Sequence, residues 1–164
     1  TAGAAFGIVP YGTEAMGTLR IEKGHVVVGA EADGRTTADD LGLGGLVNPN
    51  KWCVGKPLLG RAGLVASDRW QLVGLEALEG ARIPRGGKLV ADPDHALPNP
   101  MLGHVTSWCF SPYRNAWIAL ALLMNGRARH GEQLWVVSPL ADAKALVKIG
   151  PPCCIDPDGE RLRA

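Results

Sequence analysis

The sequence predicts an α+β fold in which a helix near the N-terminus precedes a small antiparallel β-barrel or sandwich. Apolar residues with helical spacing follow Thr13. The sequence after Arg69 instead consists of short apolar runs separated by Gly and Pro. The chain has 164 residues and is 46% hydrophobic, so it can bury one sizeable core or two small ones.

The helix is expected over about residues 14–23. Thr13 precedes it as a side-chain cap, and Gly24 can end it in the left-handed conformation. A short apolar run at residues 25–29 then leads into a polar loop whose Asp33-Gly34 pair favours a turn.

A capping box is expected within that loop. Thr37 is followed three residues later by Asp40, which takes the place of the usual Glu or Gln. This pattern predicts a helical segment that begins near Ala38. The segment is expected to be short because a glycine-rich sequence follows it.

Six strands are expected in the second part of the chain. Apolar runs at intervals of roughly ten residues are typical of an antiparallel barrel or sandwich. The expected strands are residues 70–75, 88–91, 103–110, 116–124, 133–138 and 145–149. The composition changes between residues 60 and 68, so we expect one domain over residues 1–65 and a barrel domain over residues 66–164.

The charge and hydropathy of the chain argue against two classes of partner. Seventeen basic and sixteen acidic side chains give a formal net charge of +1, which offers no footprint for nucleic acid. The longest apolar stretch, residues 116–124, is far shorter than the roughly 20 residues of a membrane helix. We therefore expect neither a nucleic-acid partner nor a membrane.

The N-terminus and the cysteines indicate a cytoplasmic piece of a longer protein. No initiator Met and no secretion signal opens the chain, so we interpret Thr1 as an internal cut. The cysteines lack the spacing of a disulfide framework, and reduced thiols in the cytoplasm account for them most simply. They are Cys53, Cys109, Cys153 and Cys154.

Several familiar chemistries find no support in the sequence. The glycine-rich segment 42–47 has Val47 where a dinucleotide-binding loop needs its third glycine. His104 and Cys109 are the nearest pair of metal-ligand types, but strand alternation would point them to opposite faces, so no metal site is predicted. No Gly-x-Ser-x-Gly elbow is present, and no catalytic residue is predicted.

A candidate polar site lies at the end of the predicted helix. Residues 20–25 (RIEKGH) bring together two bases, an acid and an imidazole. Arg20 and Glu22 are two residues apart and do not face each other on a helix, so one of them can turn inward toward a partner or ligand. The alternative is an ordinary solvated helix end.

Residues 11–15 (YGTEA) and 19–25 (LRIEKGH) resemble the folate-binding half of the sarcosine oxidase alpha-subunit family, and residues 31–44 continue the resemblance. Residues 103–107 (GHVTS) and 156–160 (DPDGE) resemble the C-terminal barrel of the wider aminomethyltransferase family. Essentially the whole chain is covered. The resemblance implies the last helix and strand of a ferredoxin-like subdomain, followed by a small antiparallel β-barrel.

The resemblance also implies a function. In such a complex a flavin on another subunit oxidises sarcosine, and the imine passes to tetrahydrofolate, giving 5,10-methylenetetrahydrofolate and glycine. The implied partners are tetrahydrofolate and the other sarcosine oxidase subunits, with FAD, FMN and NAD elsewhere in the complex. Enclosure protects an imine that water would hydrolyse.

Two departures from the wider family bear on this resemblance. Ala15-Met16-Gly17 replaces the Ala-Arg-Asp triplet of the wider family, which favours sarcosine oxidase over the alternative, a glycine-cleavage aminomethyltransferase. The family's Gly-Tyr-Thr-Gly-Glu motif, whose glutamate holds the pterin, lies upstream of Thr1. We therefore expect the chain alone to be inactive.

The folate-facing surface is expected around Arg20, Glu22, Arg69 and Trp70. A folate tail needs a cation, its rings need apolar or aromatic walls, and Arg69-Trp70 offers both at the expected domain boundary. An alternative interpretation is that Arg69 is a solvated strand end and that Trp70 belongs to the barrel core. A non-catalytic docking module is a further alternative, with the five tryptophans as anchors.

Overall fold

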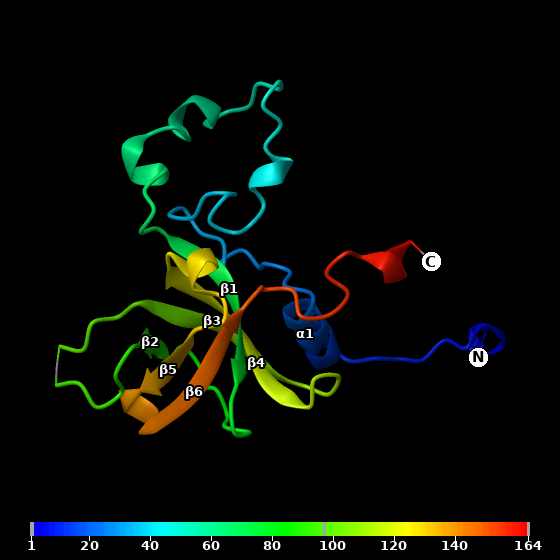
Figure 1. Ribbon diagram of the computed structural model, residues 1–164. Coiled ribbons are helices and arrows are strands. Elements are labelled where there is room, and N and C mark those ends of the chain that lie inside the picture. The colour runs from blue at the N-terminus through cyan, green and yellow to red at the C-terminus, as the bar shows by residue number, and fades with distance from the viewer. Residues whose placement is uncertain (1, 97, 164) are drawn as a thin grey trace.

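The centre of the molecule is a closed six-stranded antiparallel β-barrel, seen in a computed structural model that describes residues 2–96 and 98–163 (Figure 1). The strand order around the barrel is β1-β4-β3-β2-β5-β6. The strands are β1 (Trp70–Ala77), β2 (Lys88–Val90), β3 (Gly103–Ser111), β4 (Ala116–Met124), β5 (Gln133–Ser138) and β6 (Ala143–Gly150). The six predicted strands and the α+β class are confirmed, and the sheet closes as a barrel rather than a sandwich.

Strand β4 is buried on both faces, which explains its continuous apolar sequence. Ala119, Ala121 and Leu123 belong to the core inside the barrel. Ile118, Leu120 and Leu122 alternate with them and form a second apolar cluster on the outer face, together with Ile21 of the N-terminal helix.

That helix, α1 (Thr13–Glu22), lies against the outer face of β3 and β4 (Figure 1). The prediction of Thr13 as its cap is wrong: Thr13 is already helical, and Gly12 with its extended backbone is the N-cap. Gly24 ends the helix at φ 72° as predicted, and its amide donates to the Ile21 carbonyl at 3.0 Å. Within residues 2–96 and 98–163, no helix has the length and apolarity to cross a membrane.

Irregular chain joins α1 to β1 and projects from the barrel as an open lobe (Figure 1). The strand implied after α1 is absent from this part of the structure; a single bridge between Val28 and Ala32 stands in its place. Thr37 and Asp40 do form the reciprocal hydrogen bonds of a capping box, but they close one turn rather than a helix. The short 3-10 helices are η1 (Ala4–Phe6), η2 (Gly44–Leu46), η3 (Lys56–Leu58), η4 (Ala62–Leu64), η5 (Gly126–Arg129), η6 (Pro139–Ala141) and η7 (Glu160–Leu162).

A β-bulge in β3 decides which side chains of that strand face α1. Val105 pairs with Ala121 and Ser107 with Leu120, so Thr106 is the extra residue. Before the bulge Val105 points into the barrel core, whereas after it Ser107 shares the outer face with Leu120. The bulge thus brings polar side chains of β3 under the helix.

Candidate functional site

The first polar cluster joins α1, the following loop and β3. Arg20 donates to Glu31 Oε2 at 3.0 Å and to Ser107 Oγ at 2.5 Å. Ser107 Oγ in turn donates to Glu31 Oε1 at 2.5 Å, and the Val27 amide donates to Glu31 Oε2 at 2.9 Å. Both carboxylate oxygens of Glu31 are therefore occupied within the protein.

Glu31 is 1% exposed, so its ionisation depends on these partners. Burial alone would raise its pKa. The hydrogen bonds from Ser107 and the Val27 amide, together with the charge of Arg20, outweigh burial and hold the pKa of Glu31 below its ordinary value. The cluster is a charged and fully hydrogen-bonded contact between the helix and the barrel.

Glu22 anchors the chain's C-terminal segment as well as the helix. Its carboxylate accepts a hydrogen bond from Ser111 Oγ at 2.5 Å, and its backbone oxygen accepts the amides of Cys154 and Ile155 at 3.0 and 3.2 Å. Glu22 is buried and does not face Arg20, as the two-residue spacing predicted.

Arg69 makes an ion pair with Asp40 across the start of β1. Its Nε lies 2.8 Å from Asp40 Oδ1, and its other nitrogens reach the carbonyls of Arg35 at 2.8 Å and Gly63 at 3.1 Å. Burial opposes ionisation of Asp40, but the hydrogen bonds from Arg69 and Thr37 keep its pKa below the ordinary value. Arg69 therefore holds together the loop before the barrel.

Beside this ion pair lies a cavity of about 250 Å³ with an aromatic wall. The rings of Trp70 and His104 are 5.2 Å apart and tilted by 55°. Burial lowers the pKa of His104, so its imidazole is neutral at neutral pH. The lining residues are Asp33, Arg35, Thr36, Arg69, Trp70, His104 and Leu122.

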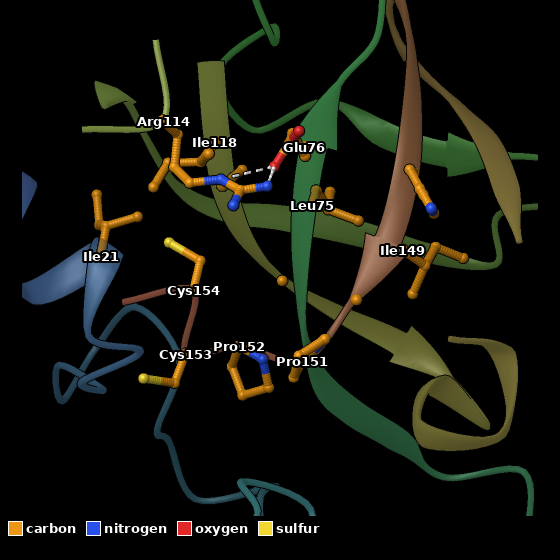
Figure 2. Close-up of a pocket in the computed structure, with 14 residues that line it drawn as sticks. Ile21, Leu75, Glu76, Arg114, Ile118, Ile149, Pro151, Pro152, Cys153 and Cys154 are labelled. Atoms are coloured by element: carbon orange, nitrogen blue, oxygen red, sulfur yellow. Dashed lines mark hydrogen bonds and ion pairs between the residues drawn. The ribbon is translucent and has the colours of Figure 1, made fainter. Parts of the chain in front are cut away.

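Arg20 and Glu22 line a different cavity, of about 420 Å³, between α1 and the C-terminal segment. Lys23, His25, Asp156 and Arg161 line this second cavity as well, and Lys23 is ion-paired with Asp156 at 3.1 Å. A third cavity, of about 330 Å³, lies between α1 and β1, with the Glu76–Arg114 pair at one edge and Cys154 at another (Figure 2). The four expected site residues thus fall into two pairs in separate cavities.

The expected placement of His104 and Cys109 on opposite faces is wrong. They pair with Leu122 and Ile118, which share one face, because the bulge at Thr106 shifts the alternation. Five residues of strand still hold them roughly 16 Å apart. Residues 2–96 and 98–163 contain no group of three His, Cys, Asp or Glu side chains that could hold a metal.

The four cysteines are free thiols. Burial raises the pKa of Cys109 to about 11 and raises that of Cys154 as well, so both remain protonated at neutral pH. Neither has the properties of a nucleophile.

Glu31, Asp40, Ser107 and His104 are the important residues that the sequence did not single out as site residues. Both acids lie in the loop after α1, which the sequence predicted only as polar, with a turn at Asp33-Gly34. The capping box was the one local signal that gave Asp40 a structural role.

The barrel and the segment that precedes it match known families. The model of the "Glycine cleavage T-protein C-terminal barrel domain" matches residues 71–153, and that of the "GCVT N-terminal domain" matches residues 1–51. The chain belongs to the glycine cleavage T-protein C-terminal barrel family.

Among its relatives, sarcosine oxidase subunit alpha of Rhizobium meliloti (strain 1021) is 43% identical over 98% of this chain, and that of Corynebacterium sp. (strain P-1) is 39% identical over 98%. The chain spans only 16% and 17% of those two proteins. An aminomethyltransferase of Synechococcus elongatus is 38% identical over 80% of this chain and 34% of its own length.

A solved structure supports the fold alone. Glycine cleavage system aminomethyltransferase T from Bartonella henselae superimposes with a TM-score of 0.63 at 22% identity. The match covers 87% of this chain and 39% of that one. The architecture is therefore that of a known barrel with its preceding helix.

Proposed function

We propose that this chain is a tetrahydrofolate-binding part of a sarcosine oxidase alpha subunit. The observation that carries the proposal is the 43% identity to such a subunit over nearly the whole chain, including both segments that match the family models. The whole enzyme would oxidatively demethylate sarcosine to glycine and transfer the one-carbon unit to tetrahydrofolate.

The proposal has consequences for assembly. The enzyme would be cytoplasmic, other sarcosine oxidase subunits would be the partners, and FAD, FMN and NAD would be bound elsewhere in the complex. Within this chain we retain residues 1–65 as the end of the folate-binding subdomain and residues 66–164 as the barrel domain.

The cavity beside Arg69 is the better candidate for the folate wall. Trp70 and neutral His104 give it an aromatic surface on which a pterin or aminobenzoyl ring can pack without displacing a charge. Arg69 supplies a cation at its edge, although Asp40 already holds that guanidinium. Arg20 and Glu22 lie in the cavity between α1 and the C-terminal segment. Arg20 is paired with Glu31, and Glu22 accepts a hydrogen bond from Ser111.

Two substitutions separate a folate contact from a structural tie at Arg69. Arg69→Ala removes the cation and the tie, whereas Asp40→Asn weakens the tie and keeps the cation. If Arg69 also binds a folate carboxylate, Arg69→Ala in the intact enzyme should lose about 1.5–3 kcal/mol of folate affinity. Asp40→Asn should retain it.

Calorimetric titration with tetrahydrofolate measures both affinities, and sarcosine oxidation without folate is the activity control. Unchanged folate affinity in Arg69→Ala would remove Arg69 from the site and leave it structural.

The alternative function is that of a glycine-cleavage aminomethyltransferase, which the 38% identity to the Synechococcus elongatus protein favours. Met16 and Gly17 argue against it, because they replace the Arg-Asp of that family's triplet. The coding sequence upstream of Thr1 discriminates the two: a nucleotide-binding fingerprint there would support sarcosine oxidase, and its absence the aminomethyltransferase.

A further inference from the structure

One end of the barrel carries an aromatic and cationic surface that the folate proposal does not use. Trp108, Phe110 and Trp117 lie on the inward-facing sides of β3 and β4, where the barrel opens. Phe110 and Trp117 pack edge to face with ring centroids 5.8 Å apart, and Phe110 is 42% exposed.

Two arginines cover these rings from the β1–β2 connection. The Arg82 guanidinium lies 5.2 Å from the Trp117 ring centroid, and that of Arg85 lies 5.2 Å from the Trp108 centroid. Both arginines are exposed, and neither makes a hydrogen bond or ion pair to any residue within 2–96 and 98–163. We call these five residues the barrel-end surface.

Two features position the arginines of the barrel-end surface before any partner arrives. Ile83, between the two arginines, is completely buried in the barrel core and fixes the connection that carries them. The cation–π contacts with the indoles restrict the two guanidinium groups as well. An interaction with a preorganised surface loses less side-chain entropy than one with flexible arginines.

Apolar rings alone would be enough to close this end of the barrel. The two arginines, which have no acidic partner among the described residues, therefore need a different explanation. Trp, Tyr and Arg are enriched where protein interfaces concentrate their binding energy. A guanidinium group over an indole keeps its N–H donors, and carboxylates accept from such donors in bidentate geometry.

We propose that the barrel-end surface docks another subunit of the enzyme, through a segment that presents Asp or Glu carboxylates beside apolar side chains. The inference rests on the proposed function, because it requires a multi-subunit enzyme. The carboxylates would bind Arg82 and Arg85, and the apolar side chains would pack on Phe110.

The direct test is photo-crosslinking in the full-length complex, with p-benzoylphenylalanine in place of Phe110. We expect a crosslink to another subunit, at a peptide that contains Asp or Glu. A crosslink within the same polypeptide, or none in a complex that retains activity, would overturn the proposal.

A second test uses charge reversal, with a control at Lys144, which lies over another indole but is ion-paired with Asp94. The double variant Arg82→Glu, Arg85→Glu should dissociate from the partner at least tenfold more readily, as native mass spectrometry across a dilution series measures. Lys144→Glu is the control, because Lys144 lies 5.7 Å from the Trp135 centroid on the β5–β6 side of the barrel. This control should assemble normally.

The outcomes separate the two proposals. If the unmodified protein assembles with no other subunit and shows no sarcosine-dependent activity, the proposed function fails and the docking surface fails with it. If the unmodified complex is active and the double variant assembles equally well, or if Lys144→Glu dissociates to the same extent, only the docking surface is overturned.

Discussion

Glu31 carries a charge at a place that water does not reach, and the contact between helix and barrel depends on it. Arg20, Ser107 and the Val27 amide satisfy its two oxygens. A buried carboxylate is stabilised when every donor around it forms a hydrogen bond. If a neutral group replaces it, some of these donors lose their acceptor. The residue therefore ties segments that are distant in the sequence.

Glu31→Gln should destabilise this chain by about 2 kcal/mol at pH 7, since it removes a charge-assisted set of hydrogen bonds. The pKa of Glu31 is lowered in the folded state, so its stabilisation is fully present above the ordinary glutamate pKa of 4.5 and is lost as pH falls through the lowered value. Urea unfolding at several pH values should show the difference between the two proteins shrinking below about pH 4.5.

The exposed Glu79→Gln variant is the matched control and should behave like the unmodified chain. A stability difference for Glu31→Gln that stays constant from pH 7 to pH 3 would contradict the role assigned to the charge.

At the scale of elements, the end of β6 shows how the barrel is joined to the helix. The chain leaves β6 at Gly150 and passes over β1, where Pro151 to Cys154 reach the neighbourhood of Ile21 (Figure 2). Gly74 pairs with Gly150 in the register, and a Cβ at Gly74 would collide with the backbone of Pro151. Glycine is required there because the segment crosses the strand closely.

Gly74→Ala should therefore destabilise the chain by about 1–3 kcal/mol, the usual cost of forcing atoms into a filled site. Gly150→Ala is a matched control in the same register pair, because a Cβ there has no neighbour within 4 Å, and it should change stability by less than about 0.5 kcal/mol. Thermal or urea unfolding compares the two variants, and equal costs would be inconsistent with the close crossing.

At the scale of the whole molecule, the buried acids that join helix, loop and barrel are committed to contacts within the chain. The acids Glu22, Glu31 and Asp40 are engaged in hydrogen bonds or ion pairs, and the half-buried thiols of Cys109 and Cys154 are protonated at neutral pH. In a subunit of this kind, reacting groups would come from other parts of the enzyme.

We expect the 164-residue chain alone to produce no hydrogen peroxide from sarcosine. The reason is that the chain corresponds to only 16% of the Rhizobium meliloti relative, whereas the oxidation needs a flavin that we propose is bound elsewhere in the complex. A peroxidase-coupled assay on the purified chain measures this, with the intact enzyme as the positive control. Peroxide above background from the chain alone would refute the assignment.

The sequence by itself determined the strands and their class. Alternation of short apolar runs with Gly and Pro is a local property, so all six strands were found, with β2, β3, β4 and β5 within one residue of their ends. The Gly24 helix end and the Thr37–Asp40 capping box were predicted for the same reason, since each depends on residues a few positions apart.

Only the tertiary structure decided which side chains meet. One extra residue at Thr106 reverses the alternation along β3, and no local pattern revealed it, so His104 and Cys109 were placed on the wrong faces. Arg20 meets Glu31 and Ser107, and Arg69 meets Asp40, across 11 to 87 residues of chain. Such contacts arise from the packing of the helix and loop onto a closed barrel, because partners so far apart are set by topology and register rather than by neighbouring residues.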